Sequence, residues 1–159
     1  MTVVILPDSA VEPSPQSVVL ADGDMIDAER AEVLAVAREI ALLATEETGA
    51  ATGPIVVRWR PGAEPAEMRP VTELRVPLTE ARLGVDFARA VGRYLTAHGW
   101  SGGIVRPLPA LKLQASRDDR TIAVAWLDQV VLIEVHGRAL PMSVEDARKL
   151  LAETAPADG

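Results

Sequence analysis

The sequence predicts an α+β domain in which a mainly antiparallel sheet is packed by two long helices and a short C-terminal helix. Apolar residues recur at helical spacing over residues 27–48 and 83–98, and elsewhere they alternate with polar residues in short runs typical of half-buried strands. The resulting order of helix, two strands, helix, three strands and helix suits a sheet with helices packed against it.

An extended arm is predicted for residues 1–24, because Pro7, Pro13 and Pro15 interrupt its short apolar runs. A single domain is expected over residues 25–154, followed by a short tail at residues 155–159. A chain of 159 residues has the usual length of one domain, and it shows no internal repeat.

The first helix is expected to begin at Asp27, which has the side chain of an N-cap, and to end at Thr48 before Gly49. Pro54 then precedes a strand over residues 55–60, in which apolar residues alternate with Arg58 and Arg60. These two arginines should point away from the core.

Three prolines and a glycine predict a loop over residues 61–70, and alternation predicts a second strand over residues 74–78. The second helix has one apolar face and one face rich in arginine, and it should end near His98 at Gly99. Gly84, Ala88 and Gly92 recur every four residues on this helix, which predicts a groove that a backbone or another helix can approach. Residues 100–103 are expected to form a loop.

Three strands are predicted next, over residues 111–116, 121–127 and 130–135, with a turn at residues 117–120 and another at 128–129. The last of these strands is apolar on both faces apart from Glu134, so it should lie centrally or under a helix. Ser143 is expected to cap the C-terminal helix.

The composition disfavours an enzyme. The chain has no Cys and no Asn, two His and two Lys, so most side chains that perform acid–base, covalent or metal chemistry are scarce. A disulfide or thiolate metal site is excluded, and we expect no cofactor and no metal. Glu134 and His136 share a strand face and could pair, but two ligands do not make a metal site.

The charge is unevenly distributed along the chain. The net charge is −7, with −8 over residues 1–57, +4 over residues 58–120 and −3 over residues 121–159. An acidic protein is repelled by nucleic acid and by anionic membranes, so nucleic acid is an unlikely partner and no membrane is expected. The arginine-bearing stretch either faces water or docks on an acidic surface of another subunit or partner.

One motif favours an alternative function. Gly99-Trp100-Ser101-Gly102-Gly103 matches the G-x-S-x-G pattern of α/β-hydrolases, and Asp118 and His136 follow in that family's order. A small serine hydrolase would use Ser101, His136 and Asp118. The motif stands after a predicted helix and before a strand, whereas a nucleophile elbow follows a strand and begins a helix.

Arginines on the first hairpin and the second helix are the candidate partner-binding residues. If the hairpin packs beside the helix, their guanidinium groups form one patch that holds carboxylates or phosphates. A patch of this kind allows a second alternative, a binder of an anionic ligand or nucleic acid, although aromatic residues for stacking bases are scarce. The predicted set is Arg58, Arg60, Arg75, Arg82, Arg89 and Arg93.

The function these observations favour is a non-catalytic protein–protein interaction or assembly module, such as an adaptor, connector or chaperone-like subunit, that binds a protein partner or its own copies. Its predicted order of elements is similar to that of acidic secretion chaperones and small virion connector proteins, with no shared residue motif. The first residues lack a basic leader, and the apolar run ends at Pro7. We therefore expect a cytoplasmic protein, or one within a larger particle.

Overall fold

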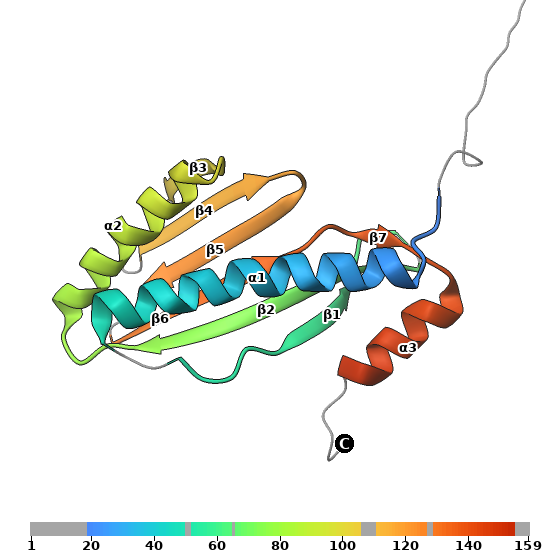
Figure 1. Ribbon diagram of the computed structural model, residues 1–159, viewed down its shortest axis with the longest axis horizontal. Coiled ribbons are helices and arrows are strands. Elements are labelled where there is room, and N and C mark those ends of the chain that lie inside the picture. Colours follow the sequence, from blue (N-terminus) through green and yellow to red (C-terminus); the bar gives the residue numbers. More distant parts are fainter. Residues whose placement is uncertain (1–18, 50–51, 65, 106–110, 127–128, 155–159) are drawn as a thin grey trace, which may run out of the picture.

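The computed structural model describes residues 19–49, 52–64, 66–105, 111–126 and 129–154, so residues 1–18 of the predicted arm and the tail at residues 155–159 lie outside it. Within the described part, a seven-stranded antiparallel sheet packs with three helices (Figure 1), which confirms the α+β prediction.

The sheet places its strands in the order β1-β2-β6-β5-β4-β3, and the short β7 pairs with β2. β1 and β3 therefore form the two edges, and β6 lies centrally, as predicted. The strands in chain order are β1 (Val57–Pro61), β2 (Glu67–Pro77), β3 (Ser101–Val105), β4 (Leu111–Arg117), β5 (Arg120–Trp126), β6 (Val130–His136) and β7 (Leu140–Pro141).

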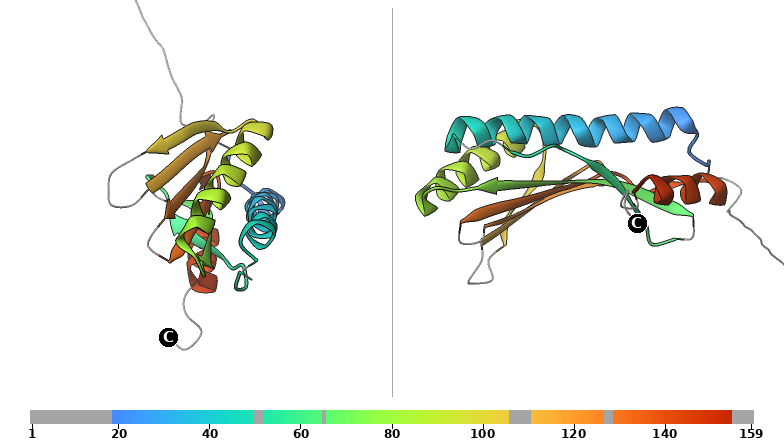
Figure 2. Two further views of the ribbon diagram at one scale, coloured as in Figure 1. Left: turned by 90° about the vertical axis from the view of Figure 1, so that its left-hand side faces the viewer. Right: turned by 90° about the horizontal axis from the view of Figure 1, so that it is seen from below.

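The helices gather on one side of the sheet. α1 (Gly23–Thr48) and α2 (Ala81–Ala97) lie over the same face, and α3 (Val144–Thr154) packs beside the β1 edge (Figure 2). Successive strand residues point to opposite faces, so the residues between those that meet the helices form a second face. We call this second face, which α1 and α2 do not cover, the open face.

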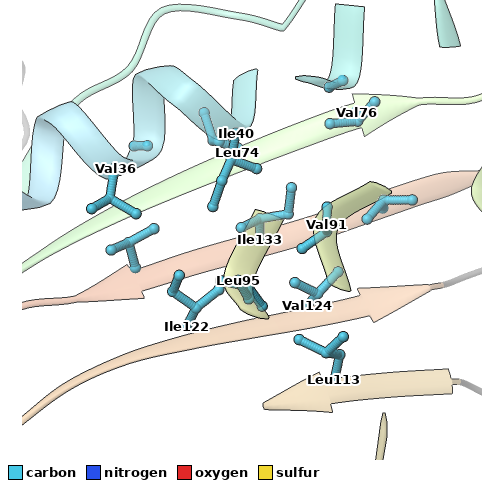
Figure 3. Packing of buried hydrophobic residues seen from close by; sticks show 14 of the residues in the cluster. Val36, Ile40, Leu74, Val76, Val91, Leu95, Leu113, Ile122, Val124 and Ile133 are labelled. Atoms are coloured by element: carbon cyan, nitrogen blue, oxygen red, sulfur yellow. The ribbon is translucent and has the colours of Figure 1, made fainter. Parts of the chain in front are cut away.

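The main core fills the space between the sheet and the two long helices. Val36 and Ile40 of α1 and Val91 and Leu95 of α2 pack toward the strands (Figure 3). The strand residues that they meet include Leu74, Val76, Leu113, Ile122, Val124 and Ile133. A second cluster joins α3 to β1 and the start of α1 through Ile26, Trp59, Met68, Leu140, Met142, Ala147 and Leu150.

The first helix begins earlier than predicted. Its N-cap is Asp22, whose Oδ1 accepts a hydrogen bond from the Met25 N–H at 2.9 Å, so Asp27 lies inside the helix rather than at its cap. The preceding Ala21 is buried and donates its N–H to the carbonyl oxygen of Pro141. The helix ends as predicted at Gly49, whose φ is +72°.

Two predicted loops contain strand residues instead. β2 already begins at Glu67 and includes Pro70, whose carbonyl oxygen accepts a hydrogen bond from the Gly137 N–H. The predicted loop at residues 100–103 gives way to β3 at Ser101. Gly102 permits this pairing at φ +152°, since a Cβ there would collide with the carbonyl oxygen of Gln114.

The other turns and caps follow the sequence. Asp118 and Asp119 both have positive φ, 52° and 64°, and form the two-residue turn predicted between β4 and β5. Ser143 caps α3 by accepting the N–H of Asp146 at 3.0 Å. The short β7 was not predicted, and the predicted turn at 128–129 falls partly outside the described residues.

Candidate functional site

The open face is a grid of side chains aligned by the strand register. One row crosses the sheet from Arg58 through Val71, His136, Thr121 and Ser116 to Ser101. Further along the strands, Glu73, Glu134, Ala123 and Gln114 form a second row, and Arg75, Leu132, Ala125 and Lys112 form a third. Charged and hydroxyl side chains from five or more strands thus share one surface.

The structure separates the predicted arginines into two groups. Arg58, Arg60 and Arg75 lie exposed on the open face. Arg89 and Arg93 are exposed on α2, which packs on the opposite face. Arg82 belongs to the first turn of α2, and its side chain lies outside the described part.

The separation follows from the way α2 packs. Phe87 and Val91 are fully buried against the sheet face that holds Leu74 and Val76. The hairpin arginines alternate with these core residues and therefore point to the other side. One continuous patch of hairpin and helix arginines does not form among the described residues.

The open-face arginines surround two carboxylates. Glu73 and Glu134 are register partners on β2 and β6. Glu134 lies 2.9 Å from His136 Nε2, as the shared strand face led us to expect, and 4.0 Å from Arg60 Nη2. Within the described chain no group of three His, Cys, Asp or Glu side chains is placed to hold a metal ion.

A small groove lies at the β1 side of the open face. Its volume is about 230 Å³, and three arginines and Glu73 are among the residues that line it. Its lining residues are Gly53, Pro54, Val56, Arg58, Arg60, Val71, Glu73, Leu74 and Arg75. Guanidinium groups in this density bind carboxylates or phosphates bidentately.

The three residues of the alternative serine hydrolase are not assembled. Ser101 on β3 is separated from His136 on β6 by β4 and β5, which corresponds to about 14 Å across three strand spacings. The Nε2 atom of His136 instead contacts Glu134. Ser101 and Asp118 do line the same cavity, of about 850 Å³, but His136 is not among its lining residues.

The glycine-rich motif also has the wrong local context for a nucleophile elbow. It follows the C-terminal end of α2, with Gly99 at φ +81°, and it leads into β3. The carbonyl end of the helix therefore precedes Ser101, and no helix N-terminus supports an oxyanion there.

A buried ion pair joins α1 to β5 on the helix-covered face of the sheet, and the sequence analysis did not predict it. Glu29 of α1 is 5% exposed, and its two carboxylate oxygens accept hydrogen bonds from Arg120 Nε and Nη2 at 2.7 and 2.8 Å. The backbone N–H of Arg138 donates to Glu29 as well, at 2.9 Å. Burial raises the pKa of Glu29, but these donors outweigh it and hold the pKa below its ordinary value.

Four open-face residues with polar side chains were also missed: Arg69, Ser116, Thr121 and Arg138. Arg69 fell in a predicted loop, and the two hydroxyl residues carried no motif. Their proximity depends on strand register, which the sequence pattern did not supply. The alternation of polar residues along β4 and β5 was the available signal for the hydroxyl residues.

Among the described residues, none of the helices has the length and apolar character needed to cross a membrane.

Comparisons with models of protein families, with curated proteins and with solved structures found no match to this chain.

Proposed function

We propose that this chain is a non-catalytic protein–protein interaction or assembly module and that the open face is its binding surface. The observation that carries the proposal is the one-sided packing of the sheet. α1, α2 and the core occupy one face, while the other presents an apolar centre within a charged rim.

The side chains of the open face have the distribution expected of an interface. Leu132, Ala123 and Ala125 are half-buried neighbours near the middle of the sheet. Arg75 and Lys112 flank this centre on β2 and β4 and are exposed. An apolar centre within a polar rim is typical of protein interfaces, and alanines let a partner backbone come close.

The charge of the rim favours an acidic partner surface, and the chain itself provides one. α1 carries seven acidic and two basic side chains, and Asp24, Asp27, Glu39 and Glu46 are exposed. We therefore assign the α1 surface of a second copy as the occupant of the open face. Because α1 and the open face lie on opposite sides of the sheet, the contact is heterologous and generates a ring or a filament.

The mass of the chain in solution, measured by light scattering at low and high salt, tests this proposal. We expect oligomers that dissociate above about 0.5 M salt, where the Debye length falls below about 5 Å. The double variant Arg58→Gln, Arg75→Gln should be monomeric. The matched double variant Arg148→Gln, Lys149→Gln removes the same charge from exposed positions on α3, which belongs to neither contact surface, and should assemble as the wild type does.

A wild-type chain that stays monomeric at low salt and high concentration would overturn self-assembly. Equal loss of assembly in both double variants would overturn the assignment to the open face, because it would show an effect of net charge alone. Circular dichroism of each variant checks that the fold is retained.

A further inference from the structure

Three arginines lie side by side at one end of the open face. Arg60 on β1 is the register partner of Arg69 on β2. Val71 pairs with His136, and Arg138 follows two residues beyond His136, where it lines the same cavity as Arg69. The hydrogen bond from the Gly137 N–H to the Pro70 oxygen, at 2.8 Å, continues this alignment past the end of β6. We call Arg60, Arg69 and Arg138 the arginine row.

The arginine row is only partly neutralised within the described chain, because Arg60 reaches Glu134 at 4.0 Å and Glu29 interacts with the charge of Arg138. Like charges opposite one another on neighbouring strands repel. Among the described residues, the guanidinium groups of Arg69 and Arg138 form no ion pair within 4.0 Å, and that of Arg60 reaches Glu134 only at that limit. The backbone N–H of Arg138, by contrast, donates to Glu29. The Nε of Arg69 is buried without a hydrogen-bond partner, while that of Arg138 donates to the backbone oxygen of Asp118 at 3.0 Å.

Next to the arginine row, three hydroxyl groups lie on successive strands. Thr121 on β5 is the register partner of Ser116 on β4, which is the register partner of Ser101 on β3. Side chains in such positions stand about 5 Å apart. All three residues are exposed, and together with Arg69 and Arg138 they line the cavity of about 850 Å³.

We propose that this cavity binds a phosphate monoester. Arg69 and Arg138 supply the positive charge and the paired N–H donors that fit phosphate oxygens, and the hydroxyl of Thr121 donates beside them. Arg117 also lines the cavity, but its guanidinium donates to the carbonyl of His98 at 2.6 Å and stacks on Trp100. Arg117 therefore forms part of the wall.

The rest of the cavity selects an ester over free phosphate. Asp118 and Asp119 also line the cavity and weaken the attraction for a bare anion. Carboxylates accept hydrogen bonds from hydroxyl groups, so a phosphorylated polyol can bind the arginines through its phosphate and the two aspartates through its hydroxyl groups. The volume is also larger than a phosphate group alone requires.

Isothermal titration calorimetry of the full chain with glycerol 3-phosphate tests the site, with glycerol, inorganic phosphate and succinate as parallel ligands. We expect saturable binding of glycerol 3-phosphate, weaker binding of inorganic phosphate and succinate, and none of glycerol. Inorganic phosphate binding as tightly as the ester would overturn the choice of an ester. Succinate binding as tightly, or no saturable binding of either phosphate ligand, would overturn the phosphate site.

Three variants locate the site. Arg138→Gln should weaken binding of glycerol 3-phosphate about tenfold or more, because a charge-assisted donor is lost. Thr121→Val, at an exposed position, should weaken it about threefold to tenfold. Arg148→Gln removes an exposed arginine from α3 and should bind as the wild type does. Equal weakening in Arg148→Gln and Arg138→Gln, or unchanged binding in both cavity variants, would overturn the assignment.

Discussion

The two faces of the sheet are built by the same strands but have different environments. On β6, Val131, Ile133 and Val135 are at most 1% exposed beneath the helices. Leu132 and Glu134 alternate with them on the open face and are half-buried. The helix-covered face thus accounts for most of the buried apolar surface, whereas the open face presents arginines and hydroxyl groups to solvent. We infer that substitutions on the first face change stability and that those on the second change binding.

Neighbouring residues on β6 give the largest test of this contrast. Ile133→Ala removes a fully buried side chain and should lower the free energy of unfolding by about 4 kcal/mol. Leu132→Ala, one residue earlier, should cost about 1 kcal/mol or less, because its side chain is already partly solvated. Urea unfolding followed by circular dichroism measures both values. Similar losses in the two variants would show that the faces contribute equally to stability.

The ion pair on the helix-covered face should likewise contribute more to stability than the ion pair on the open face. Glu29→Gln leaves Arg120 buried without its counter-charge and should destabilise the fold by about 3 kcal/mol. Glu134→Gln on the open face, where the side chain is 32% exposed, should change stability by about 1 kcal/mol or less. The same unfolding experiment compares them, and a larger effect for Glu134→Gln would reverse the contrast.

The pH dependence separates the charge of Glu29 from its packing. Folding lowers the pKa of Glu29, so its ionised carboxylate stabilises the fold at neutral pH. This stabilisation is lost as the pH falls from the ordinary glutamate pKa, about 4, toward the lower pKa of the folded state. The stability difference between wild type and Glu29→Gln should therefore shrink in acid. If the difference in unfolding free energy between the two proteins stayed constant from neutral pH to about pH 3, the charge of Glu29 would not stabilise the fold.

Much of the fold could be predicted because local patterns agree with the tertiary structure. The alternation around Arg58 and Arg60 and the periodicity that buries Phe87 and Val91 both gave the correct faces. The errors occurred where pairing overrode local preference. Pro70 and Gly102 are typical loop residues, yet both lie in strands. Gly102 pairs closely with β4, where a Cβ would collide with the carbonyl oxygen of Gln114.

The candidate sites were harder to predict than the elements. Arg69 and Arg138 are distant in the sequence and become neighbours only through the register of β2 and β6. Arg89 and Arg58 were expected on one patch, but the side of the sheet that α2 covers was not encoded in any local pattern. Strand order, crossover side and register are properties of long-range packing, so a single sequence indicates them weakly.

A glycine on α2 gives the smallest and most specific test. Gly84, Ala88 and Gly92 predicted a groove on this helix. A Cβ added at Gly92 would have no described atom within 4 Å, so no described backbone approaches α2 at that residue. Gly92→Ala should therefore stabilise the chain by about 0.5–1 kcal/mol, the usual preference for alanine in a helix. Gly102→Ala on β3 should destabilise it, because Gln114 blocks the new side chain. If Gly92→Ala instead lowered the midpoint of urea unfolding, another backbone would contact the predicted groove in solution. α2 would then be a second surface for assembly, in addition to the open face.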